Sequence, residues 1–256
     1  PEGACRKHRR GAADMGDTMT GRDLVTQVLW TAQALEGAPV PRLLRDSGAV
    51  ITANLLDFLN TAVRAVVTHC PQATAITESV RLEPGMRQRI PSRKIHRSQA
   101  DAETLLRVTR NMGTDGETPG TPVLAAELAM LMAWGAFPSP AGQTHASVQN
   151  FAYDRLSNPS VFFVVPAVPE DCDVWVELTY SAKPKQLTSI DDLLPVSDEY
   201  EQALVHSMLY SIFAADADQG NLARAVQHQQ AFISELDMKR QGDMVQYGFD
   251  VAGRSL

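Results

Sequence analysis

Four aspartates stand in two close pairs, and carboxylates at such spacing can do chemistry. Asp171 and Asp173 flank a cysteine, and Asp191 is followed directly by Asp192. Carboxylate oxygens are the ligands that Mg²⁺ and Ca²⁺ prefer, so either pair could help to hold the cation of a metal-dependent enzyme. Each pair also lies in a turn beside proline or serine, where charged side chains commonly face solvent. We interpret both pairs as solvated surface.

No stretch of the sequence matches a common catalytic or nucleotide-binding motif. The patterns GxSxG, HExxH and GxxxxGK[ST] do not occur, and the glycine-rich residues 113–121 have no lysine to reach a phosphate. The six histidines share no metal-ligand spacing. Cys5, Cys70 and Cys172 are far apart, which predicts buried or idle thiols. We therefore expect no enzyme activity, no metal and no cofactor.

Acidic residues are concentrated in one part of the chain. The formal net charge is −7, and residues 166–220 contain eleven acidic residues against only Lys183 and Lys185. A surface that binds nucleic acid needs the opposite sign of charge, so this segment does not favour DNA binding. The candidate residues for an acidic surface are Glu170, Asp171, Asp173, Asp191 and Asp192.

Basic residues gather in two places. Residues 1–19 are predicted to be a disordered basic arm, because they contain four closely spaced arginines and lysines and no apolar pattern. The second group could hold phosphate or an acidic partner, and a charged hairpin tip is an equally simple interpretation. It consists of Arg87, Arg89, Arg93, Lys94 and Arg97.

Four segments have the apolar spacing of amphipathic helices, namely residues 20–35, 52–69, 198–215 and 221–239. Thr20 with Asp23, and Asp198 with Glu201, have the three-residue spacing of a capping box. Both pairs therefore predict the start of a helix. No apolar run approaches the roughly 20 residues that cross a bilayer, so we expect no membrane segment.

The apolar stripes of these helices have no other surface to cover, which predicts one helical bundle. The bundle would be built from residues 20–73 and 196–240. Its predicted core comprises Leu56, Leu59, Val63, Leu204, Met208, Val226, Phe232 and Leu236.

Residues 74–195 predict a mostly β insertion in this bundle, so the expected fold class is α+β. One predicted hairpin joins residues 76–82 to 86–90 through a Pro-Gly turn, and another joins 160–165 to 174–180. In the last run, alternation places Val174, Val176, Leu178 and Tyr180 on one face. Three further segments are a helix or strand at residues 105–109, a short helix at 125–134 and a strand at 148–153.

The last residues, 241–256, follow a predicted helix end at Gly242 and are rich in apolar and aromatic side chains. A solvated tail is normally poorer in such residues. The tail could fold back on its own bundle, but we favour docking on a partner. The candidate docking residues are Met244, Val245, Tyr247, Phe249 and Val251.

Short motifs follow one another in a fixed order along the chain. Three proline-containing motifs mark the strands, NP at residues 158–159, VP at 165–166 and YSAKP at 180–184, and two helices with a polar turn follow. LLDFLN at residues 55–60 and VTRNMG at 108–113 precede them. In this order the motifs resemble the head-to-tail adaptor (connector) proteins of tailed bacteriophages. The tryptophan that often opens the family's second helix is absent.

The resemblance implies a structural virion protein that forms a ring of twelve copies between the portal and the tail. It implies the portal and a tail or nozzle protein as partners, with genomic DNA passing through the channel without specific binding. An acidic surface facing the lumen would repel DNA phosphates. The expected location is the virion neck, after assembly in the host cytoplasm. A stopper or tail-completion protein of the neck is the alternative. The resemblance also favours a strand at residues 105–109.

Overall fold

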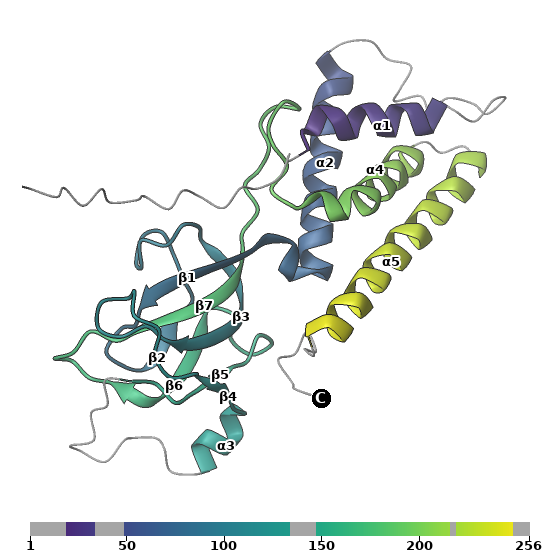
Figure 1. Ribbon diagram of the computed structural model, residues 1–256. Coiled ribbons are helices and arrows are strands. Elements are labelled where there is room, and N and C mark those ends of the chain that lie inside the picture. Colours follow the sequence, from purple (N-terminus) through teal and green to yellow (C-terminus); the bar gives the residue numbers. More distant parts are fainter. Residues whose placement is uncertain (1–18, 34–48, 134–146, 216–218, 248–256) are drawn as a thin grey trace, which may run out of the picture.

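The computed structural model describes residues 19–33, 49–133, 147–215 and 219–247. Within these ranges the chain is a mixed α+β protein with five α-helices and two sheets, which confirms the predicted class. Figure 1 shows the longer helices at one end of the molecule and the sheets, with the short helix α3 (Leu128–Ala133), at the other. Residues 1–18, most of the predicted basic arm, lie outside the described residues.

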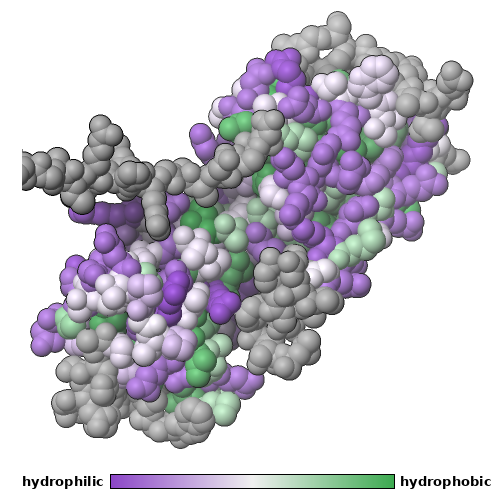
Figure 2. Space-filling model, viewed as in Figure 1, coloured by the Kyte–Doolittle hydropathy of each residue, from purple (hydrophilic) through white to green (hydrophobic). Residues whose placement is uncertain are grey.

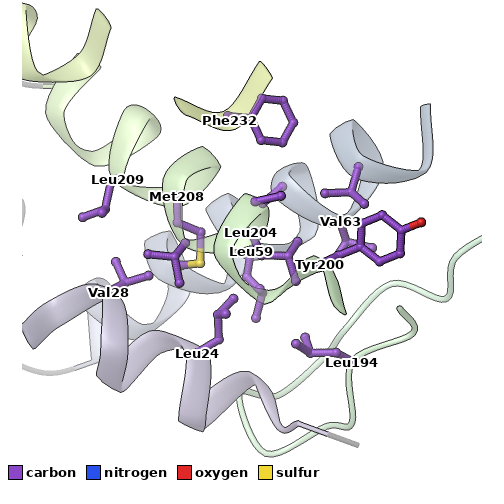
Figure 3. Close-up of a cluster of buried hydrophobic side chains, with 14 of the residues drawn as sticks. Leu24, Val28, Leu59, Val63, Leu194, Tyr200, Leu204, Met208, Leu209 and Phe232 are labelled. Carbon is purple, nitrogen blue, oxygen red and sulfur yellow. The ribbon is translucent and has the colours of Figure 1, made fainter. Parts of the chain in front are cut away.

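The four helices at the first end share one apolar core. They are α1 (Gly21–Gln33), α2 (Ala49–His69), α4 (Glu201–Ala214) and α5 (Gln219–Tyr247). Helix α4 contacts the other three, and eight of its fourteen residues are buried. Figure 3 shows the centre of this core, where Leu24, Leu59 and Met208 meet. The finer description, a helical bundle with a β insertion, stays a prediction.

Six of the eight predicted core residues are buried, namely Leu59, Val63, Leu204, Met208, Phe232 and Leu236. Leu56 is partly buried against the same core. Val226 is 52% exposed, so its assignment to the core is wrong. The reason is the register of α5, which buries Ala225 and Phe232. Because one residue turns a helix by about 100°, Val226 lies to the side of that contact.

One predicted capping box is confirmed and the other is wrong. At the start of α1, the Asp23 N–H donates to Thr20 Oγ1 at 3.3 Å and the Thr20 N–H donates to Asp23 Oδ2 at 3.1 Å. Asp198 lies in a 3₁₀ turn before α4, and its carboxylate accepts the N–H of Met19 at 3.2 Å. A partner distant in sequence therefore replaces the reciprocal contact with Glu201.

The described strands form two sheets at the other end of the molecule. The first has the order β1-β7-β3 and consists of β1 (Ala75–Arg81), β7 (Trp175–Ala182) and β3 (Ala102–Asn111). The second has the order β2-β6-β5-β4 and consists of β2 (Gly85–Arg89), β6 (Val161–Val168), β5 (Asn150–Tyr153) and β4 (Leu124–Ala125). The predicted strands at residues 148–153 and 105–109 are confirmed, and so is a short helix within 125–134.

Both predicted hairpins are wrong, because the chain changes sheet at each turn. Gly85 has a φ of +101°, as the Pro-Gly signal predicts, but the turn leads from β1 into β2 of the other sheet. Residues 169–174 likewise lead from β6 to β7. Strand β1 pairs with β7 and β2 pairs with β6, both antiparallel. The segments 75–89 and 161–182 therefore run side by side as one long ribbon.

Both sheets contribute to a second apolar core. On β7, Val176, Leu178 and Tyr180 are fully buried, which confirms the predicted alternation. Phe162 and Val164 of β6 belong to the same cluster. The strands therefore have a core separate from that of the helices.

Two buried asparagines hold distant loops by pairing with backbone groups. On α2, Asn60 Nδ2 donates to Leu187 O at 3.1 Å, and Asn60 Oδ1 accepts the Leu187 N–H at 2.8 Å. At the end of β3, Asn111 makes the same pair of contacts with Val148, both at 2.8 Å. Leu187 lies in the segment that leads from β7 to α4. Asn60 therefore fixes the return of the chain from the strands to the helices.

Candidate interaction surfaces

The loop between β6 and β7 carries three of the candidate acidic residues. Glu170, Asp171 and Asp173 are all exposed. Asp173 forms an ion pair with Arg81 of β1, which ties the loop to the neighbouring strand. Glu170 and Asp171 form no ion pair with another residue that the structure describes. These two carboxylates are thus the uncompensated negative charge of the loop.

The second acidic pair lies in the segment before α4 and has structural partners. Asp191 accepts hydrogen bonds from Arg22 Nε at 2.7 Å and Nη2 at 3.1 Å, and these bonds lower the pKa of its carboxyl group. Asp192 accepts the backbone N–H groups of Thr188 at 2.8 Å and Ser189 at 2.9 Å, which lower its pKa as well. Asp191 joins this segment to α1, and Asp192 closes its turn.

The structure does not bring the two aspartate pairs together. Among the described residues, no three histidine, cysteine, aspartate or glutamate side chains gather where they could hold a metal ion. A cavity of about 140 Å³ lies between the start of α4 and the middle of α5, with Tyr200, Leu236 and Met238 in its lining. Typical small-ligand sites are about 300–1,000 Å³. No helix in the described ranges is long and apolar enough to span a membrane.

The candidate basic residues lie on β2 and on the loop that follows it. Arg87 and Arg89 share one face of β2, because strand side chains alternate, and Gln88 between them is buried. Arg93, Lys94 and Arg97 occupy the loop and are exposed like the two strand arginines. None of these five forms an ion pair with another described residue. We call this group the basic patch.

Hydrogen bonds hold the loop of the basic patch in a defined conformation. Asp101 accepts the N–H of Arg93 at 3.0 Å, which lowers the pKa of the Asp101 carboxyl group. Glu78 of β1 accepts the N–H of Gln99 at 3.1 Å. The buried Tyr180 hydroxyl donates to the same carboxylate at 2.8 Å. The cationic side chains are therefore displayed from an ordered surface.

The last helix is longer than the sequence predicted. Helix α5 continues through Gly242 to Tyr247, so the predicted helix end at Gly242 is wrong. Of the candidate docking residues, Met244, Val245 and Tyr247 belong to this helix by backbone position. Phe249 and Val251 lie outside the described residues. The apolar residues that predicted a tail thus include the end of a helix.

Helix α5 carries an exposed apolar row that was not predicted from the sequence. Leu222, Val226 and Ile233 have the helical spacing of one stripe with Phe232, but the structure exposes all three and buries Phe232. The width of that stripe could have indicated the exposed row, because the stripe is wider than the surface that one neighbouring helix can cover. In Figure 2, hydrophobic residues interrupt a mostly hydrophilic face along α5.

Two histidines face each other where α4 packs on α5. His206 Nδ1 lies 3.0 Å from His228 Nδ1, and the ring of His228 stacks on Phe213 with 5.6 Å between centroids. Burial lowers the pKa of His228, and the nearby His206 lowers it further. One ring must donate and the other accept, so this contact requires at least one neutral imidazole.

Comparison with known proteins places the chain in a family. Comparison of the sequence with curated proteins finds no match. The family model for the SU10 adaptor protein matches residues 19–253, which include every described helix and strand. A phage adaptor is a structural component of the virion, which points to a role in assembly rather than catalysis. The chain belongs to the SU10 adaptor protein family.

Proposed function

We propose that twelve copies of this chain form a ring that joins the portal vertex of a tailed bacteriophage to its tail and surrounds part of the DNA channel. The family match over residues 19–253 carries the proposal, because it spans both the helices and the sheets. In the proposed ring, residues 20–73 and 196–240 pack as a helical bundle beside the neighbouring copy. The β-rich residues 74–195 reach the next subunit or the tail.

Each candidate surface has a role in this ring. The C-terminal residues 241–256 dock on the portal protein, since their apolar and aromatic side chains can serve as anchors. The basic patch contacts an acidic face of a tail or nozzle protein. Glu170 and Asp171 face the lumen, where their unpaired negative charges repel DNA phosphates and reduce sticking of the genome. The assembled protein resides in the virion neck, without contact to a membrane.

Reconstitution with the portal tests this function. The purified chain is mixed with portal rings and the product is examined by electron microscopy and native mass spectrometry. A shared twelvefold ring is expected. A chain that leaves the portal bare but binds to a preformed portal–adaptor assembly acts as a stopper or tail-completion protein, and this result would contradict the proposal.

A double variant separates the adaptor from the metal-dependent enzyme. Asp171→Asn with Asp173→Asn leaves the ring and portal docking intact, because an exposed ion pair such as Asp173–Arg81 contributes at most about 1 kcal/mol. The readouts are ring mass and calorimetric titration with Mg²⁺. Magnesium binding by the original chain that the variant loses would overturn the structural role.

A further inference from the structure

The exposed side of α5 is poor in charge over residues 222–234. Between residues 222 and 234, the exposed residues are leucine, alanine, valine, isoleucine, serine and glutamine, with no charged side chain among them. Exposed positions of α2 include Asp57 and Arg64. Depletion of charge together with apolar side chains is the composition of an interface centre. This face of α5 therefore has the chemistry of a protein contact.

An apolar row runs along that face. Leu222, Val226 and Ile233 are separated by four and seven residues, so they lie on the same side of the helix. Each is about half exposed. We call these three residues the α5 row. They pack against no described element on their outer side, although Phe232 beside them is buried in the core.

A second exposed anchor lies on α1. Trp30 is 73% exposed, the most of any large hydrophobic residue on the described helices. Tryptophan is enriched among residues that dominate binding energy at interfaces. Helices α1 and α5 both pack on α4, and Figure 1 shows α4 between them. The α5 row and Trp30 thus lie on different faces of the helical end.

We propose that the α5 row of one copy packs around Trp30 of the next copy, a head-to-tail contact that rests on the ring proposed above. A second copy of this chain fits the charge pattern best. The chain has a net charge of −7, so two copies approach most easily through a surface that carries no charge. A contact between two different faces of one molecule repeats from copy to copy and forms a ring when the rotation between copies closes.

Cross-linking tests the contact directly. Two chains are prepared with Cys5 and Cys172 replaced by serine, one with Trp30→Cys and the other with Val226→Cys. Mixed chains are expected to form a disulfide-linked pair, whereas neither chain alone does. A matched mixture in which Met238→Cys replaces Val226→Cys should not cross-link, because Met238 is equally exposed but lies about 120° from Val226 around α5. Val226→Cys chains that link to one another would show that α5 meets α5 and overturn the proposal.

Charge insertion provides the second measurement. Val226→Glu with Ile233→Glu is expected to weaken self-association at least about tenfold in sedimentation velocity, since each ring contact then buries unpaired carboxylates. Met238→Glu, the matched control, retains it. Unchanged assembly of the double variant would overturn the contact.

Both measurements are made on the chain alone at high concentration and on the portal assembly. Rings on the portal without the Trp30–Val226 cross-link leave the adaptor function standing and overturn this contact. The cross-link in a chain that never assembles on the portal supports the contact and overturns the proposed function.

Discussion

Hydrogen bonding explains the two motif asparagines. Asn60 and Asn111 are buried, and each hydrogen-bonds to the backbone of a loop that is distant in sequence. Such a side chain presents one donor and one acceptor at the spacing of a peptide group, so it can satisfy both groups of one residue. The sequence showed the motifs but could not identify their partners, Leu187 and Val148.

Asn60→Ala is expected to lower the free energy of unfolding by about 1–3 kcal/mol. The substitution leaves the N–H and C=O of Leu187 without their partner in a buried position. Denaturant unfolding measures the loss. Thr61→Ala is the control, because Thr61 is exposed on the next position of α2 and should change the value by no more than about 0.5 kcal/mol. Equal effects of the two variants would contradict the bridging role of Asn60.

The His206–His228 contact predicts a loss of stability in mild acid. The pKa of His228 is lowered by burial in the folded chain, so the unfolded chain binds more protons near pH 6. Stability from this site is complete above the unfolded histidine pKa of about 6.5 and falls as the pH drops through it. Thermal unfolding between pH 7.5 and 5 should therefore show a decreasing midpoint.

The variant His228→Gln should flatten that dependence. His96 is still present in this variant. Burial lowers the pKa of His96 as well, so it contributes to the pH dependence in the same direction. Carboxyl groups with lowered pKa, such as Asp115 at about 2, lose their contribution only at more acidic pH. If His228→Gln and the original chain have the same pH profile, the histidine pair does not contribute to it.

The helices could be predicted from the sequence more closely than the pairing of the strands. Period 3.6 identified α1, α2, α4 and α5, because a helix is formed by contacts close in sequence. Strand pairing is not local, and the apolar pattern of β6 and β7 does not say which strand lies beside which. The turn at Gly85 was correctly located, but its effect, a change of sheet, depends on β7 and β6 about 90 residues later.

Phe232→Ala tests the register of α5. Phe232 is 8% exposed and lies edge-on to His69, with 5.8 Å between the ring centroids. Truncation should cost about 3–5 kcal/mol, because the core loses a large side chain and retains part of the cavity. Val226→Ala on the exposed side should cost no more than about 0.5 kcal/mol. Denaturant unfolding compares them, and the opposite order of the two losses would place Val226 in the core.

The surfaces of the molecule were harder to predict than its cores. The acidic residues were grouped by sequence, yet Asp191 is bound to Arg22 and Asp173 to Arg81, so neither is free charge. Such pairing depends on which surfaces the fold brings together. The basic patch was found because its residues are close in sequence and lie on one strand and the next loop. The α5 row was missed because apolar spacing does not distinguish buried from exposed apolar residues on a helix.

Truncation of the C-terminus tests the proposed portal contact. The last described core residue of α5 is Leu236, so removing residues 241–256 should leave the thermal unfolding midpoint nearly unchanged. The same deletion should abolish co-sedimentation with portal rings. Removing only residues 248–256 retains the helix to Tyr247. The portal binding of this shorter deletion therefore shows whether the helix end or the residues beyond it make the contact. If the longer deletion lowers the midpoint by many degrees, these residues stabilise their own chain. If it binds portal undiminished, another surface docks, and the basic patch is the next to examine.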